Sequence, residues 1–199
     1  MKRIAVYCGS SSGLNGTYRE AAGIMGRALA GRGVEIIYGG AKVGLMGELA
    51  DAALNAGGTV TGIIPHFLQT SEVAHNGLSR LIRVDSMHER KARMEEMSDG
   101  ALALPGGFGT LDELFEMLTW GQLGLHVKPV GLLNTHGFFN NLGALLDHMV
   151  SEGFLKDVNR NLLLMDEDVD GLLDRMETYV APKQPKWVFE NGTWKPLQE

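Results

Sequence analysis

Residues 101–116 read ALALPGGFGTLDELFE and combine the end of an apolar run, a glycine turn and a group of carboxylates. The apolar run stops at Pro105, and three glycines follow within four positions. Glycine lets the backbone approach a ligand closely, and the first N–H groups of a helix are unpaired and carry a partial positive charge. This order predicts a phosphate-binding turn between a strand and a helix. A tight turn without a ligand would use the same glycines, so one such stretch leaves both interpretations open.

Strands alternate with helices on both sides of this stretch. Short, almost continuously apolar runs predict strands at 3–8, 34–40, 59–65, 80–84, 100–105, 128–134 and 161–165. Helical spacing of apolar residues predicts helices at 15–33, 44–58, 86–98, 110–124, 137–153 and 168–180, and residues 66–78 are predicted as a loop. Strands of this kind are typical of a parallel sheet covered on both faces. The predicted fold class is therefore α/β, a single-domain doubly wound (Rossmann-like) parallel sheet with helices on both faces.

The composition excludes several classes of protein. The chain has 199 residues, enough for one sizeable core, and its 27 glycines are about twice the usual ~7% share. The net charge is −6 and no basic run is interleaved with aromatic residues, which argues against a nucleic-acid partner. The single cysteine, Cys8, excludes an internal disulfide. No window of 18 residues is both apolar and uncharged, so no membrane partner is expected, and a cytoplasmic location follows by default.

Three glycine turns, at 9–13, 39–47 and 105–109, follow predicted strands. Ligands of doubly wound sheets bind beyond the carboxyl ends of the strands, where the strand order reverses, so three turns at one edge favour a phosphate ligand. None of them matches GxGxxG, and the absence of a Gly-Lys dipeptide excludes a Walker A loop. No HExxH or CxxC occurs, and His75 and His88 have no partners at ligand spacing, so no metal is expected.

Charged residues follow two of the predicted strands. Thr110 and Glu113 have the spacing of a capping box, as do Ser86 and Glu89. Glu113 also follows the predicted phosphate turn, where a carboxylate could stabilise an oxocarbenium-like sugar or activate water. Arg90 and Lys91 could hold an anion, although two basic side chains that only face solvent would give the same sequence.

Three motifs together resemble those of the Lonely Guy (LOG) family. They are GGAKVGLMG (39–47), SMHERKARM (86–94) and PGGFGTLDE (105–113), and the stretch TWGQLGLHVKPVGLLN (119–134) also fits. Members of this family are cytokinin riboside 5′-monophosphate phosphoribohydrolases, long mislabelled as lysine decarboxylases. Ala41 and Phe108 are small departures from the pattern. The resemblance extends over residues 1–180, which it implies are a Rossmann-like nucleotide-binding catalytic domain, and residues 181–199 are predicted as an irregular C-terminal tail.

The resemblance implies hydrolysis of the N-glycosidic bond of a nucleoside 5′-monophosphate to free base and ribose 5-phosphate. The substrate would be a cytokinin riboside 5′-monophosphate or, as in an AMP nucleosidase, AMP, and the base preference stays open. The family works as a homodimer without metal or organic cofactor. Arg90 and Glu113 match its catalytic residues. Together with the glycine turns, the resemblance implies the substrate-binding residues Gly40, Gly44, Glu72, Lys91, Gly106, Gly107, Phe108, Gly109, Thr110, Leu111, Asp112 and Thr119.

A non-catalytic nucleotide or molybdenum-cofactor carrier is the alternative, because such carriers use a similar sheet and PGG turn. The combination of Arg90 and Lys91 with Glu113 favours an enzyme, since a carrier would not need all three. A lysine decarboxylase is the weakest alternative, because no lysine has a recognisable pyridoxal-phosphate context.

Overall fold

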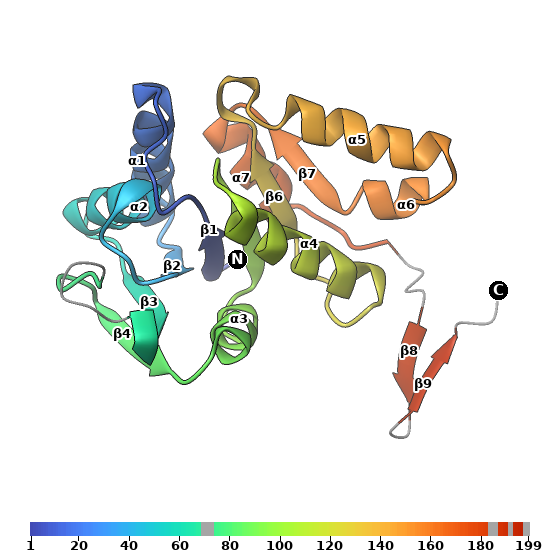
Figure 1. Ribbon diagram of the computed structural model, residues 1–199, viewed down its shortest axis with the longest axis horizontal. Coiled ribbons are helices and arrows are strands. Elements are labelled where there is room, and N and C mark those ends of the chain that lie inside the picture. Colours follow the sequence, from blue (N-terminus) through green and yellow to red (C-terminus); the bar gives the residue numbers. More distant parts are fainter. Residues whose placement is uncertain (69–73, 183–186, 191–192, 197–199) are drawn as a thin grey trace.

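The computed structural model describes residues 1–68, 74–182, 187–190 and 193–196, with side chains up to residue 182. A seven-stranded sheet forms its centre, in the order β4-β3-β2-β1-β5-β6-β7, and all neighbouring strands are parallel (Figure 1). The strands are β1 (Arg3–Tyr7), β2 (Glu35–Tyr38), β3 (Val60–Pro65), β4 (Arg80–Val84), β5 (Gly100–Ala103), β6 (Val130–Leu133) and β7 (Leu163–Asp166).

Helices cover both faces of this sheet. They are α1 (Gly16–Gly31), α2 (Gly44–Asn55), α3 (Met87–Glu96), α4 (Phe108–Gln122), α5 (Asn140–Ser151), α6 (Asp157–Arg160) and α7 (Val169–Glu177), with short 3-10 turns η1 (His66–Leu68) and η2 (Thr135–Gly137). On β1, Ile4 and Val6 belong to a core with α1, α2 and α7, whereas Ala5 and Tyr7 belong to a core with α3, α4 and α5. Because successive strand residues point to opposite faces, a strand between two cores is apolar at nearly every position. The predicted doubly wound parallel sheet is confirmed.

The strand order reverses beside β1. The chain moves outward from β1 to β4 on one side and then returns to place β5 on the other side of β1. The connections after β1 and β5 therefore diverge, which opens a crevice at the carboxyl ends of these strands. The glycine turn at 105–109 lies at this crevice, because it follows β5 and leads into α4.

The start of α4 corrects one local prediction. The helix begins at Phe108 with Gly107 as its N-cap, and no side chain caps it, so Thr110 and Glu113 do not form a capping box. Both lie inside the helix and are buried. At α3 the expected cap is present, since Ser86 Oγ accepts from the Glu89 N–H at 3.1 Å. The Glu89 carboxylate reaches one residue further back, to the N–H of Asp85 at 2.9 Å.

The prediction of an irregular tail is wrong for part of residues 181–199. Strands β8 (Trp187–Glu190) and β9 (Thr193–Pro196) pair antiparallel. Two β-prone runs separated by Asn-Gly are a hairpin pattern, which the prolines at the start of the tail obscured. The domain boundary near residue 180 stays a prediction. Residues 66–78 are also not loop throughout, because η1 and a bridge between Ala41 and Ala74 interrupt them.

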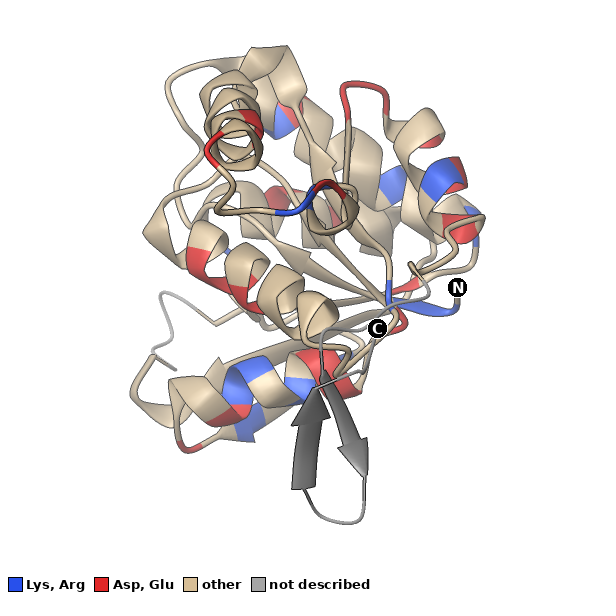
Figure 2. Ribbon diagram, turned by 90° about the vertical axis from the view of Figure 1, so that its right-hand side faces the viewer, with Lys and Arg blue, Asp and Glu red and all other residues tan. Residues whose placement is uncertain are grey.

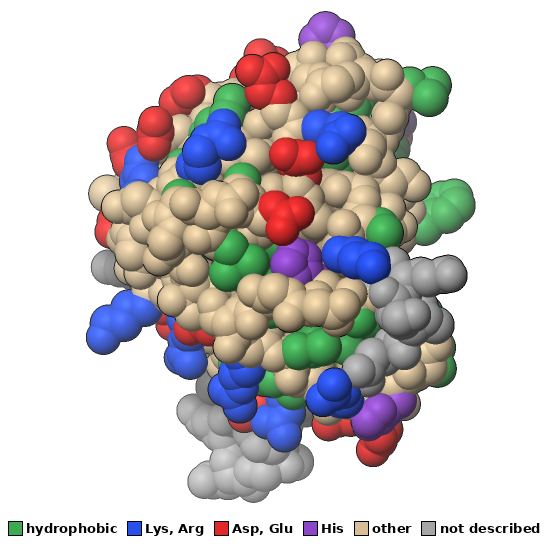
Figure 3. Space-filling model, turned by 90° about the vertical axis from the view of Figure 1, so that its left-hand side faces the viewer, with side chains coloured by type: hydrophobic (Ala, Val, Ile, Leu, Met, Phe, Trp, Pro, Cys, Tyr) green, Lys and Arg blue, Asp and Glu red, His purple; other side chains and the backbone are tan. Residues whose placement is uncertain are grey.

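The surface and the helices add two observations. Acidic and basic side chains are interspersed on the face at the left of Figure 1 (Figure 3). No helix within the described part of the chain is long and apolar enough to cross a membrane.

Candidate active site

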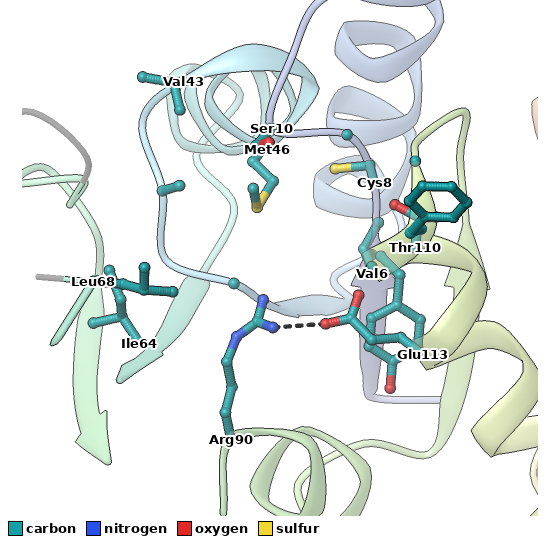
Figure 4. Close-up of a pocket in the computed structure, with 17 residues that line it drawn as sticks. Val6, Cys8, Ser10, Val43, Met46, Ile64, Leu68, Arg90, Thr110 and Glu113 are labelled. Carbon is teal, nitrogen blue, oxygen red and sulfur yellow. Dashed lines mark hydrogen bonds and ion pairs between the residues drawn. The ribbon is translucent and has the colours of Figure 1, made fainter. Parts of the chain in front are cut away.

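A cavity of about 590 Å³ lies at the crevice where the strand order reverses. Its floor is formed by the ends of β1 and β2, where Tyr7, Cys8 and Gly39 line it. Arg90 of α3 enters from one side, and the first turns of α4 close another side (Figure 4). The cavity is therefore bounded by segments that are far apart in sequence.

Arg90 and Glu113 form a close ion pair inside this cavity. Arg90 Nη1 lies 2.6 Å from Glu113 Oε1, and the two side chains are only 11% and 9% exposed. The Arg90 Nε also donates to the carbonyl oxygen of Ile63, at 3.2 Å. Figure 4 shows the two charged groups pointing toward one another from α3 and α4. The structure thus brings together the two residues for which the family resemblance implies a catalytic role.

Gly39 makes room for the guanidinium. A Cβ at this position would collide with Arg90 Nη2 and would lie 3.0 Å from Met46 Sδ. Gly40 and Gly44 of the same turn were predicted to bind substrate, but neither lines the cavity. Both have a positive φ, of 75° and 63°, which explains glycine there by backbone conformation. The close approach of Gly39 was missed because it depends on a helix from elsewhere in the chain.

The amino-terminal end of α4 faces the cavity beside this ion pair. Gly107, Phe108, Gly109 and Thr110 all line it. A Cβ at Gly107 or Gly109 would meet nothing within 4 Å, so the space above both is open. The unpaired N–H groups of a first helical turn favour an anion in such a space.

Gly106 has a different role, because it does not line the cavity. A Cβ on Gly106 would collide with the side chain of Thr110 and would lie 2.9 Å from the Gly9 nitrogen. The Gly9 N–H donates to the carbonyl oxygen of Pro105 at 3.0 Å. Gly106 therefore allows the turns after β1 and β5 to pack together.

Burial controls the protonation of the groups around the ion pair. Burial raises the pKa of Glu113 above its usual value, although the nearby Arg90 opposes this shift. Burial, with the added negative charge of Glu113, also raises the pKa of Tyr7 and of Cys8. Both stay neutral at ordinary pH, so Cys8 lines the cavity as a thiol and not as a thiolate nucleophile.

The remaining predicted substrate-binding residues that the structure describes do not line this cavity. Lys91 pairs instead with Asp112 at 3.2 Å and with Glu116 at 3.1 Å. Leu111 packs against the core beneath α4. Thr119 is exposed further along α4 and lines a separate hollow. Glu72 lies outside the described residues. Among the residues that the structure describes, no group of three His, Cys, Asp or Glu side chains could hold a metal ion.

An apolar wall that sequence reasoning missed lies across the cavity from Glu113. It consists of Val43, Met46, Ile64 and Leu68, which come from the β2–α2 turn, α2, β3 and η1 (Figure 4). Val43 and Leu68 remain exposed, at 37% and 41%. In the sequence, the only sign that these residues line a cavity is their position next to predicted strand ends and glycine turns. The wall suits an apolar or aromatic part of a ligand.

Known proteins resemble this chain in both sequence and fold. A family model described as possible lysine decarboxylase matches residues 46–176. The chain is 46% identical over 179 residues to the probable cytokinin riboside 5′-monophosphate phosphoribohydrolase LOGL9 of Oryza sativa subsp. japonica, a match that covers 90% of this chain and 79% of that protein. It is 42% identical over 194 residues to cytokinin riboside 5′-monophosphate phosphoribohydrolase LOG1 of Arabidopsis thaliana, covering 98% of this chain and 90% of that protein.

The solved structure of a cofactor-binding protein shares the fold of this chain. The molybdenum cofactor binding protein from Rippkaea orientalis aligns with a TM-score of 0.68 at 22% identity, over 89% of this chain and 97% of that chain. At this identity the likeness concerns the fold alone.

Proposed function

We propose that this chain, which belongs to the LOG family of cytokinin riboside 5′-monophosphate phosphoribohydrolases, hydrolyses the N-glycosidic bond of a nucleoside 5′-monophosphate. Water adds to C1′ of the ribose, and the bond between C1′ and the base nitrogen breaks. The electron pair of that bond leaves with the base, which takes up a proton. The products are the free base and ribose 5-phosphate.

The observation that carries this proposal is the buried Arg90–Glu113 pair beside the uncapped start of α4. Phe108 and Glu113 are five residues apart, which is about 7.5 Å along a helix axis, comparable to the length of a ribose 5-phosphate. A 5′-phosphate at the first turn of α4 would therefore place the sugar beside Glu113. An ionised Glu113 would stabilise the positive charge that develops on the sugar in the transition state.

Arg90 has two roles in this mechanism. It engages an anionic group of the substrate, and its charge opposes the effect of burial on Glu113, so that more of the carboxylate is ionised. The carbonyl of Ile63 fixes the direction of the guanidinium through the Nε bond.

The apolar wall supports a finer proposal about the base. Val43, Met46, Ile64 and Leu68 offer no charged group to a purine edge, so an adenine with an apolar N6 substituent fits as well as adenine itself. We expect the enzyme to accept both AMP and its N6-prenylated analogue. Met46→Gln should lower kcat/KM for the prenylated nucleotide about 10-fold relative to AMP, since a polar atom would then face the substituent. An unchanged ratio would place the substituent elsewhere.

The test of the proposed function is the release of free base, followed by chromatography, from AMP and from N6-isopentenyl-AMP. Tight binding of AMP in calorimetry without base release over hours would instead support a carrier. A homodimer, a cytoplasmic location and independence from metal and organic cofactors remain predictions. Light scattering tests whether the protein is a homodimer, and activity that survives treatment with a chelator supports independence from metals.

A further inference from the structure

Lys91 follows Arg90 directly on α3, but the two side chains contact different residues of α4. Successive helical residues point about 100° apart, so the two side chains leave α3 in different directions. Arg90 reaches Glu113, whereas Lys91 Nζ lies 3.2 Å from Asp112 Oδ2 and 3.1 Å from Glu116 Oε2. The Lys91 side chain is only 14% exposed, so its ammonium group is held between the two carboxylates of α4.

The two ion-paired groups form adjacent layers between the same two helices. One layer, Arg90 with Glu113, lines the cavity, and the other, Lys91 with Asp112 and Glu116, lies outside it. Figure 2 shows the basic segment of α3 directly below the acidic first turns of α4. The outer layer therefore joins α3 to the first turns of α4 directly beside the Arg90–Glu113 contact.

From this geometry we infer that Lys91 is a positioning residue, which holds α3 against the start of α4 and so keeps Arg90 on Glu113. It does not contact the nucleotide. The inference rests on the proposed function for its kinetic consequences. It differs from the substrate-binding role that the family resemblance implies for Lys91.

The charges around Glu113 set its pKa, so the pH dependence of the rate is a second measurement of the role of Lys91. The titratable and charged groups that act on Glu113 or respond to its charge are Arg90 and Lys91 of α3, Asp112 of α4, and Tyr7 and Cys8 of β1. Lys91 lowers the pKa of Glu113 and Asp112 raises it. Through these two charges alone, removal of Lys91 would move the acidic limb of the pH–rate profile upward and removal of Asp112 would move it downward. Arg90 lowers the pKa of Glu113 more strongly than either of them changes it, so a variant that draws Arg90 away moves the acidic limb upward.

The experiment compares four variants in base release from AMP. Lys91→Met removes the ammonium group, and the double variant Asp112→Asn/Glu116→Gln removes both of its partners while it keeps Lys91. Lys91→Arg keeps a cation that can still pair with the carboxylates. Arg93→Met is the matched control, because Arg93 forms an exposed pair with Glu96 on the same helix.

We expect Lys91→Met and the double variant each to lower kcat roughly 10- to 100-fold, since small misplacements of catalytic groups have effects of this size. KM for AMP should change less than kcat does, because the N–H groups at the start of α4 still hold the 5′-phosphate when Arg90 moves. The acidic limb should move upward in both variants, because both draw Arg90 away from Glu113 and Arg90 acts more strongly on its pKa than Asp112 or Lys91 does; opposite shifts would contradict the positioning role. Lys91→Arg should recover most of kcat, and Arg93→Met should match the wild type.

A raised KM with unchanged kcat in Lys91→Met, and no effect of the double variant, would overturn the inference and make Lys91 a substrate ligand. A crystal structure of Lys91→Met gives a readout that needs no activity. A lengthened Arg90–Glu113 contact supports the positioning role, and an unchanged contact overturns it. Wild-type protein that released no base would refute the proposed function alone, and the crystal structure would still test the role of Lys91.

Discussion

Replacement of Glu113 by glutamine removes one negative charge from the cavity and leaves the shape of the side chain almost unchanged. The Glu113 side chain is 9% exposed, so its charge acts through an effective dielectric constant of roughly 20 and not through that of water. A full positive charge about 4 Å away would then be stabilised by about 4 kcal/mol. The transition state carries only part of that charge, and Arg90 at 2.6 Å offsets part of the carboxylate. About 3 kcal/mol remains, which corresponds to a loss of roughly 10²-fold in kcat.

The assay is the chromatographic measurement of base released from saturating AMP, at a pH where wild-type activity has reached its plateau. KM should change little in Glu113→Gln, because the charge on the sugar develops only in the transition state. Glu96→Gln is the matched control, since this carboxylate is 68% exposed at the end of α3 and pairs with Arg93. It should keep wild-type kcat.

A Glu113→Gln variant that retained more than about half of the wild-type kcat would refute the mechanism. A large rise in KM at constant kcat would also refute it, because the carboxylate would then bind the ground state. The same loss of kcat in Glu96→Gln would show that the effect does not arise in the cavity.

Three further predictions follow from the same cavity. Arg90→Met leaves Glu113 buried without its partner and should lower the free energy of unfolding by about 3–5 kcal/mol, measured with urea; a loss below about 1 kcal/mol would contradict a buried pair. Gly39→Ala places a Cβ against the guanidinium and should lower kcat/KM about 10-fold or more in the base-release assay, whereas Gly31→Ala, which meets nothing within 4 Å, should leave it unchanged. The rate should rise with pH through the pKa of Glu113, which burial raises above that of an ordinary glutamate, so a kcat/KM profile that stays flat down to pH ~4 would contradict an essential ionised Glu113.

Local sequence pattern accounts for most of the fold. The strands were predictable because a strand between two layers of helices must be apolar on both faces, as β1 is. The turn at 105–109 was predictable because a strand, glycines and a helix follow one another directly. The helix boundaries were harder to predict. α4 begins at Phe108 and not at Thr110, because its N-cap is Gly107, which has no side chain to signal the start of a helix.

The sequence by itself determined where strands and helices alternate, that the strands are apolar on both faces and, through the family motifs, which two charged residues belong together. Only the tertiary structure decided that Arg90 and Glu113 meet, that Gly39 leaves room for the guanidinium and that Lys91 turns away from the cavity. The physical reason is that burial and periodicity are local properties of the chain. Strand order brings α3 and α4 to the same face of the sheet, and this depends on contacts between segments that the local pattern does not relate to one another.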